Sequence, residues 1–264
     1  MNLYFWRRTK IPVVVLSGLI AARAGSINIS AFTPVIDRGF AMAKKTGQLV
    51  LAIESPGGSA VQSDLLGQLI RRRAAENDVK VTAVIGDVGA SGGYWLACAA
   101  DRIVANRLSI VGCIGVITGG FGLDKFLARY DIERRLFTAG ENKARLETFS
   151  PLRPQDEVFV KELLADAHDV FKAWVRERRG ERLSAPESEI FDGGFMLGER
   201  AKTLGLVDAL GDLDSVIKEL GGEKARAAYL KPKRTRGLLR LVAGSAAEAV
   251  LDVAEQKLLT PTLR

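Results

Sequence analysis

The chain has 264 residues, of which 47% are hydrophobic and 26% charged, the balance of an ordinary folded globular protein. This composition excludes a disordered chain, a collagen-like repeat and a protein with many membrane spans. The formal net charge is +7, and residues 223–240 supply most of it, with seven Lys and Arg residues against one acid. The rest of the chain is nearly neutral, so we expect no nucleic-acid partner.

The apolar runs alternate between strand and helix patterns along the chain. We expect strands at residues 11–20, 49–53, 79–85, 103–105 and 114–117, and helices at residues 32–45, 63–75, 94–100 and 154–178. This alternation predicts a single α/β domain with a largely parallel sheet flanked by helices. Functional groups in such sheets gather at the carboxyl ends of the strands, where two Gly-rich loops of this chain fall.

Residues 11–20 follow the basic residues Arg7 and Arg8 and have two interpretations. A basic start, a short apolar run and small residues after it are features of a cleaved signal peptide. The run is rich in β-branched residues, and cleavage would discard the first strand of the core, so we favour a buried strand. The longest uncharged stretch, residues 108–123, contains five glycines, which favours strands and turns over a membrane-spanning helix.

The domain is expected to cover residues 1–222, and residues 223–264 are predicted to be a tail. The tail begins with the basic linker and continues into a segment with an amphipathic helical pattern, residues 238–259. We expect this segment to dock on a partner subunit or to be solvated. Peripheral contact with an anionic membrane is the alternative.

Two glycine-rich loops are the candidates for chemistry. In Gly89-Ala90-Ser91-Gly92-Gly93, a serine stands between small residues on a strand-to-helix turn, which can expose its hydroxyl or can be a tight turn only. The second loop is Ser55-Pro56-Gly57-Gly58. A backbone N–H from this loop, together with the N–H of Gly92, would form an oxyanion hole.

A nucleophilic serine needs a base, and the choice of base is limited. The single histidine, His168, is the only candidate for a Ser-His-Asp triad. It falls inside the long helix at residues 154–178, where a packed or solvent-edge histidine is the simpler interpretation. The two cysteines, Cys98 and Cys113, are too few for a disulfide framework and are expected to be buried thiols.

The two loops and several downstream segments resemble the signal peptide peptidase A (protease IV) family of Ser-Lys peptidases, within the Clp-protease/crotonase superfamily. The matching segments are SPGG at 55–58, GASGGY at 89–94, ADRIVA at 100–105, GCIGV at 112–116, GENK at 140–143 and AKTLGLVD at 201–208. The resemblance covers roughly residues 11–222 and implies a Clp-protease/crotonase-like fold.

The resemblance assigns roles to individual residues. Ser91 corresponds to the nucleophile and Lys143 to the general base, and Gly57 or Gly58 with Gly92 would line the oxyanion hole. Cys113 stands where many relatives have a serine that hydrogen-bonds the lysine amine. A thiol is a weaker hydrogen-bonding group, so the lysine is held more loosely or is oriented instead by Thr118 or Ser109.

A lysine acts as a base near neutral pH only when desolvation lowers its pKa by about 3. The sequence neighbours Glu141, Arg145 and Glu147 cannot provide that dry environment. In short members of the family the site resembles one shared between neighbouring protomers. We therefore expect a homo-oligomer that is active only when subunit contact buries Lys143.

The resemblance implies a serine endopeptidase that forms an acyl-enzyme on Ser91 and uses no metal or organic cofactor. Its substrates would be extended apolar peptides, such as signal-peptide remnants or other membrane-derived peptides. Two alternatives are a crotonase-like acyl-CoA enzyme and a catalytically silent ring-forming scaffold. We expect a cytoplasmic location, with possible peripheral contact at the inner membrane.

Overall fold

The computed structural model describes residues 9–232, and within them eight strands form one sheet with the order β6-β5-β3-β2-β1-β8. The two remaining strands lie off this path: β4 pairs with β3, and β7 pairs with β4. Every pair is parallel except β5 with β6. The strands are β1 (Lys10–Ser17), β2 (Gln48–Ser55), β3 (Lys80–Ala90), β4 (Arg102–Ala105), β5 (Ile110–Gly112), β6 (Phe195–Leu197), β7 (Ala209–Leu210) and β8 (Arg226–Leu230).

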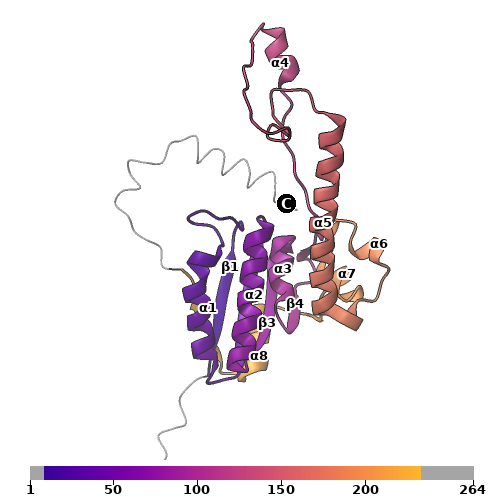
Figure 1. Cartoon of the computed structure of the whole chain (residues 1–264). Coiled ribbons are helices and arrows are strands. Elements are labelled where there is room, and N and C mark those ends of the chain that lie inside the picture. Colours follow the sequence, from indigo (N-terminus) through magenta and orange to yellow (C-terminus); the bar gives the residue numbers. More distant parts are fainter. Residues whose placement is uncertain (1–8, 233–264) are drawn as a thin grey trace, which may run out of the picture.

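Helices lie on both faces of this sheet. They are α1 (Ile29–Ala43), α2 (Ala60–Asn77), α3 (Gly92–Cys98), α4 (Asp124–Arg129), α5 (Pro154–Arg179), α6 (Glu187–Ile190), α7 (Gly198–Thr203) and α8 (Leu213–Gly221), with a 3-10 turn η1 (Gly180–Arg182). Helices α1, α2 and α3 cover one face (Figure 1). Helix α8 covers part of the other through Val216 and Ile217. None of the helices within residues 9–232 combines the length and apolarity that a bilayer span needs.

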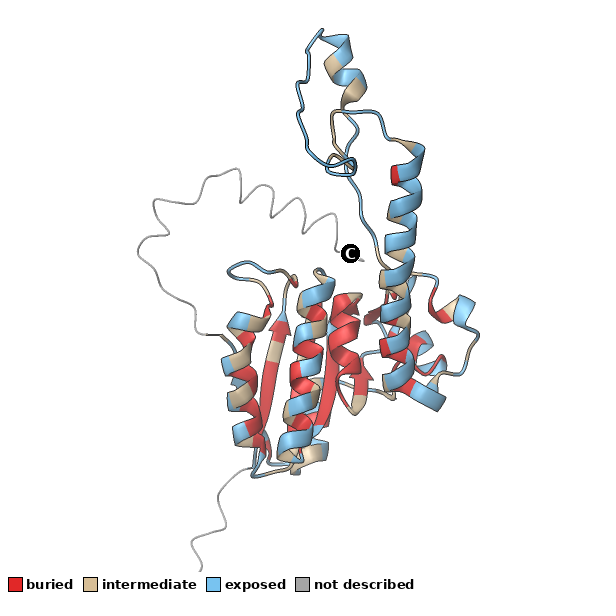
Figure 2. Cartoon of the chain, in the orientation of Figure 1, coloured by how far each residue is buried: buried red, intermediate tan, exposed pale blue. Residues whose placement is uncertain are grey.

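The side chains of the central strands alternate between two apolar layers. In β1, Val13 joins the layer under α8 and Val14 joins the layer under α1 to α3, and both are fully buried. This is the period-two alternation of a strand covered on both faces. Figure 2 shows the result, with the buried residues concentrated in the sheet and on the inner sides of the helices.

The first strand is a central member of the sheet, because β1 pairs with β2 on one side and β8 on the other. The interpretation of this segment as a buried strand is therefore confirmed. The strand ends at Ser17 rather than at residue 20, because Gly18 has a φ of +106°, a backbone conformation that glycine adopts readily.

Two predicted boundaries and one predicted strand are wrong for local reasons. Helix α1 begins at Ile29, because the Asn28 side chain caps it by accepting a hydrogen bond from the N–H of Ala31. Helix α2 begins at Ala60 for the same reason, with Ser59 as the cap. The predicted strand at residues 114–117 is absent, and β5 lies before it, because positive φ angles at Gly112 and Cys113 end the strand.

The sheet continues past the predicted domain boundary. Strand β8 pairs with β1 over five residues, so the domain extends beyond residue 222. The charged residue Arg226 and the small residues Ala227 and Ala228 conceal the strand pattern. The amphipathic segment at residues 238–259 lies outside the described residues.

Residues 115–153, here called the arm, leave the sheet after β5 and carry α4 (Figure 1). Most of the arm is exposed (Figure 2). Helix α5 leads from the arm back to the core, where Phe171, Trp174 and Val175 are buried. The long helix is confirmed, and the apolar side chains of its second half are the ones that are buried. Val158 and Leu163 are each 56% exposed, because the first half of α5 lies beside no other part of the described chain that covers them.

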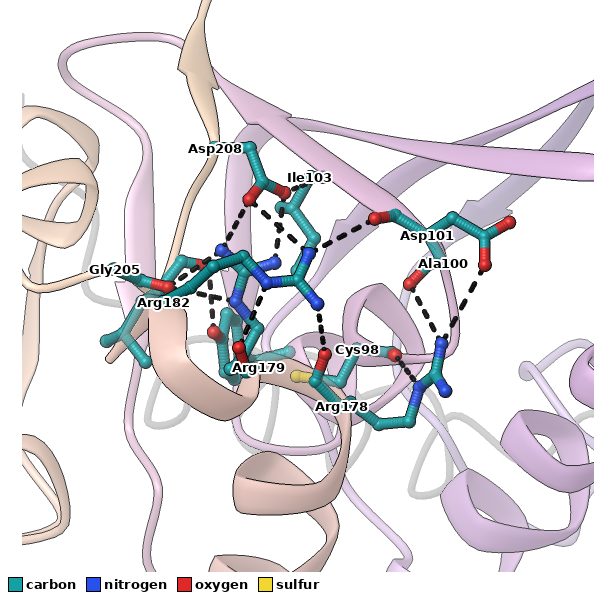
Figure 3. Close-up of polar contacts among 11 residues, drawn as sticks. Cys98, Ala100, Asp101, Ile103, Arg178, Arg179, Arg182, Gly205 and Asp208 are labelled. Carbon is teal, nitrogen blue, oxygen red and sulfur yellow. Dashed lines mark hydrogen bonds and ion pairs between the residues drawn. The ribbon is translucent and has the colours of Figure 1, made fainter. Parts of the chain in front are cut away.

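The carboxyl end of α5 is fixed to the core by arginines (Figure 3). Arg179 is almost fully buried and pairs with Asp208 at 2.8 Å, while its other contacts go to the carbonyl of Gly205. The neighbouring Arg178 donates to the carbonyl of Cys98 at the end of α3. These bonds join α5 to the helix that follows the candidate nucleophile.

Candidate active site

Ser91 occupies a strained turn between β3 and α3. Its backbone has φ 51° and ψ −122°, a conformation that is costly for a residue other than glycine. The turn is held on both sides, because the N–H of Ser91 donates to the carbonyl of Gly112 at 2.8 Å and its carbonyl accepts from Trp95 at 2.9 Å. A sharp strand-to-helix turn of this kind presents the serine hydroxyl at the carboxyl edge of the sheet.

The loop at residues 55–58 lies against this turn. A Cβ built on Gly57 would lie 2.8 Å from the Cβ of Ser91 and 2.7 Å from the backbone nitrogen of Gly92. On Gly92, a Cβ would collide with the hydroxyl oxygen of Ser63, a buried residue of α2. The fold therefore brings the two glycine-rich loops together, and it can do so because side chains are absent at their contact.

The hydrogen bonds separate the roles of the two loop glycines. The N–H of Gly57 donates to the hydroxyl of Ser55 at 3.2 Å, and its carbonyl accepts from Ile20 at 2.8 Å. Gly58 is exposed, and its N–H has no acceptor among residues 9–232. The N–H of Gly92, at the start of α3, is likewise unpaired within this range. Among the three candidate oxyanion-hole glycines, Gly58 and Gly92 therefore have N–H groups without an acceptor in the described residues, and Gly57 does not.

Cys113 lies beside Ser91 because of the register between β3 and β5. Ala90 is paired with Gly112, so the next residues of the two strands are Ser91 and Cys113. The N–H of Cys113 donates to the carbonyl of Gly194 at 2.7 Å, and burial raises the pKa of its thiol. The side chain is therefore a neutral thiol near pH 7, half-buried at the edge of the turn.

The two alternative lysine-orienting residues lie elsewhere. The hydroxyl of Ser109 is buried, donates to the carbonyl of Gly86 and lies 3.3 Å from that of Ile85. Thr118 is exposed and lines a cavity of about 630 Å³ within the arm, against the start of α5.

Lys143 lies in a turn of the arm and is exposed. Its backbone N–H donates to Gly140, but its amine forms no hydrogen bond or ion pair with any of residues 9–232. Within one chain, no hydrogen bond joins Lys143 to Ser91 or Cys113. The described part of one chain therefore does not bring Lys143 into hydrogen-bond contact with the candidate nucleophile.

His168 is engaged with the backbone. Its Nε2 lies 2.8 Å from the carbonyl oxygen of Ile114, which can only accept a hydrogen bond, so Nε2 is the donor. A ring nitrogen in this position cannot also take a proton from a serine hydroxyl. The expectation of a packed histidine agrees with this geometry.

Glu54, the residue directly before the Ser55–Gly58 loop, is not one of the site residues predicted from the motifs. Its carboxylate accepts hydrogen bonds from the N–H groups of Asp87 and Val88, three to four residues before Ser91. The available signal was an acidic residue at the end of an otherwise apolar strand, a position that requires partners when it is not fully exposed.

Comparison with known proteins settles the family. Residues 73–226 match the model of peptidase family S49. The chain belongs to this family. The family and the Clp-protease/crotonase-like fold predicted from the motifs are thereby confirmed, and a solved structure agrees. The S49 chain superposes with a TM-score of 0.52 on a serine-to-alanine mutant of the 1510-N membrane-bound stomatin-specific protease, at 15% identity, covering 86% of this chain and 100% of that one.

Two similar proteins are matched over different shares of their own length. The S49 chain is 30% identical over 204 residues to a putative protease of Synechocystis, covering 77% of this chain and 70% of the relative. It is also 39% identical over 235 residues to a Na(+)/H(+) antiporter NhaA of Brucella melitensis, covering 88% of this chain and 31% of that protein. The S49 chain therefore spans about a third of the length of the antiporter relative.

Proposed function

We propose that this S49 protein is a serine endopeptidase with Ser91 as nucleophile and Lys143 as general base. The observation that carries the proposal is the strained Ser91 turn, which lies against Gly57 and is flanked by two unpaired N–H donors, on Gly58 and Gly92. Strain at one serine combined with free donors beside it is the arrangement that acyl transfer requires.

The reaction follows from these groups. The Ser91 hydroxyl attacks the scissile carbonyl and its proton passes to the neutral amine of Lys143. The N–H groups of Gly58 and Gly92 stabilise the negative oxygen of the tetrahedral intermediate, and one such donor contributes about 10²- to 10³-fold to kcat. The protonated amine then donates to the leaving nitrogen, which leaves an ester on Ser91. A water molecule deprotonated by the same lysine hydrolyses the ester.

We place the active site between two copies of the chain. A lysine base must be neutral, and water around an exposed amine disfavours the neutral form. The arm that carries Lys143 also exposes large apolar side chains, since Phe126, Ile132 and Phe137 are 52–91% exposed. Monomeric proteins rarely expose so many large apolar groups together. A second copy seated on the arm would cover these side chains and dry the amine in one step.

The proposed substrates are extended apolar peptides of the kind left by membrane-protein processing. The segment that follows Cys113 supports this choice, because it enters the arm without regular secondary structure and presents Ile117 and Phe121 to solvent. A peptide lying along it would meet apolar side chains and unpaired backbone N–H groups, which suit an extended apolar chain.

Complementation between two inactive variants tests the proposal. The proteins are the wild type, Ser91→Ala, Lys143→Ala, an equal mixture of the two variants, and Lys125→Ala as a control for an exposed arm lysine. The measurements are mass-spectrometric cleavage of an unstructured apolar peptide and labelling by a fluorophosphonate. We expect the wild type and Lys125→Ala to cleave and neither single variant to do so. The mixture should recover about a quarter of the activity, because each site takes one residue from each neighbour.

Each result has one meaning. If Lys143→Ala cleaves as well as the wild type, the lysine assignment fails, and if Ser91→Ala does so, the nucleophile assignment fails. An inert mixture of two inactive variants, after subunit exchange has been verified by mass, rejects the shared site and leaves the dyad in place. A wild type that neither cleaves nor labels rejects the peptidase.

A further inference from the structure

Strand β3 contains a bulge shortly before the nucleophile. Ile53 of β2 pairs with Ile85 of β3, and the next pair is Ser55 with Gly89. One residue of β2, Glu54, therefore faces the three residues 86–88 of β3. Such bulges leave backbone groups unpaired and bend the strand.

The bulge is the point at which β3 changes partners. Up to Ile85 the strand pairs with β4, and from Val88 onward it pairs with β5. The second pairing is the one that brings Gly112 to the N–H of Ser91 and sets Cys113 beside it. The geometry of the nucleophile turn is thus determined by how the bulge is held.

Glu54 holds the bulge from the β2 side. Its Oε2 accepts from the N–H of Asp87 at 2.8 Å and its Oε1 accepts from the N–H of Val88 at 3.1 Å. These are charge-assisted bonds to amides that the strand ladder leaves free. The fit also requires a glycine at position 86, since a Cβ there would collide with the Glu54 carboxylate.

Ser109 holds the same bulge from the β5 side. Its buried hydroxyl donates to the carbonyl of Gly86 and lies 3.3 Å from that of Ile85, and it accepts from the N–H of Asn106 at 2.9 Å. The amides of the bulge are therefore bound by a carboxylate and its carbonyls by a hydroxyl. Neither Glu54 nor Ser109 belongs to the two glycine-rich loops.

We propose, on the basis of the function proposed above, that Glu54 is a positioning residue for Ser91. Its carboxylate fixes the bulge that carries β3 from β4 to β5, and so fixes the turn that presents the Ser91 hydroxyl beside the free N–H groups of Gly58 and Gly92. It does not touch the reacting atoms. Its effect should therefore appear in the chemical step rather than in substrate binding.

Glu54→Gln is the main test. A glutamine side chain has nearly the same shape but only one acceptor oxygen, so its amide group would face one of the two N–H donors. We expect kcat and the rate of fluorophosphonate labelling to fall together by about 10- to 100-fold, the effect of a small misplacement of reacting groups. KM should stay within about twofold of wild type, because only transition-state interactions are lost.

The matched control is Asp101→Asn. Asp101 accepts from the N–H of Val81 at 2.9 Å and pairs with Arg71 at 2.8 Å, so this variant weakens a carboxylate-to-amide contact and an ion pair at the opposite end of β3. We expect Asp101→Asn to lose about as much thermal stability as Glu54→Gln while keeping the wild-type kcat. Ser109→Ala disturbs the bulge independently and should lower kcat with unchanged KM. Combined with Glu54→Gln it should lower kcat by less than the product of the two effects.

Wild-type kcat and labelling rate in Glu54→Gln would overturn the positioning role. So would equal kcat losses in Glu54→Gln and Asp101→Asn, which would indicate general destabilisation. If Glu54→Gln does not fold, Ser109→Ala decides, and wild-type kcat in that variant overturns the role. A wild-type protein that neither labels nor cleaves rejects the peptidase itself, which separates that failure from failure of the positioning role in an active enzyme.

Discussion

Gly57 is a residue whose missing side chain shapes the nucleophile turn. Its φ is +104° and its Cα packs against Ser91 and Gly92, so both its backbone conformation and its neighbours require glycine. Gly18 has nearly the same φ, +106°, but a Cβ there would meet nothing within 4 Å. Alanine variants at these two positions therefore distinguish the free-energy cost of a side chain at a positive φ from its steric effect on the Ser91 turn.

Gly57→Ala should abolish labelling of Ser91, while Gly18→Ala should leave it intact. Both variants place alanine at a positive φ, which should lower the free energy of unfolding by about 1–2 kcal/mol in each. Only Gly57→Ala also pushes the turn at Ser91. The measurements are the fluorophosphonate labelling rate and urea unfolding, and a Gly57→Ala variant that labels at the wild-type rate would contradict the geometry.

The sequence could predict the local parts of this site. Ser91 and the glycines beside it belong to short motifs, and a motif within one loop needs no tertiary information. The choice between Gly57 and Gly58 as donor was not available, because it depends on hydrogen bonds to Ser55 and Ile20. Glu54 was missed because its partners lie across a bulge that no periodic pattern reveals.

At the scale of elements, α5 shows the same contrast between local structure, which the sequence predicts, and tertiary contacts, which it does not. Its 3.6-residue pattern predicted the helix correctly, because periodicity reports the helix itself. The pattern could not tell that the core covers only the second half, where Trp174 stacks on Trp95 with ring centroids 5.7 Å apart. The short elements after α5 were not predicted, since strands of two or three residues carry too little pattern to recognise.

Asp208→Asn tests the anchor of α5. Burial alone would raise the pKa of Asp208, but hydrogen bonds from Arg179 and from the N–H of Ile103 outweigh it and hold the pKa below its ordinary value. We expect the variant to be less stable by about 3 kcal/mol at pH 7, because Arg179 stays buried without its charge partner. The exposed pair Asp214–Lys218 supplies the control, and Asp214→Asn should change stability by less than about 0.5 kcal/mol.

The pH dependence of this anchor has a defined sign. Because folding lowers the pKa of Asp208, its contribution is fully present above the unfolded value near 3.8 and is lost as pH falls through the lower folded value. Urea unfolding from pH 7 to pH 2.5 should therefore show the wild type converging on Asp208→Asn below about pH 4. A constant difference between the two proteins across this range would contradict the ion pair.

At the scale of the whole molecule, the arm stands out because it exposes several large apolar side chains. The sheet and its helices bury most of their apolar side chains, whereas Phe137 in the arm is 91% exposed. Burial by a partner is a property of the assembly, and sequence patterns within one chain report only that the residues are apolar. The predicted oligomer therefore remains a prediction that the arm makes easy to test.

Phe137→Glu should dissociate the protein and remove its activity. A charge at this position costs little in a monomer, but it would be buried without a partner in an interface formed by the arm. The control is Tyr229→Glu, because Tyr229 is exposed on β8 at the other edge of the sheet. Sedimentation and peptide cleavage should show monomers without activity for Phe137→Glu and wild-type behaviour for Tyr229→Glu. Assembly that survives Phe137→Glu would exclude the arm as the interface.

Only the second half of helix α5 is held by the core, so its first half is a free extension that carries the arm. Residues 154–166 span about 20 Å at 1.5 Å per residue, so a tilt of about 6° where the covered half begins displaces the far end by about 2 Å. Lys143 lies in the arm, beyond that far end. In the proposed assembly, small changes in packing at Trp174 would therefore be magnified at the position of the lysine. The catalytic distance in the proposed assembly is governed by side chains that lie far from either reacting group.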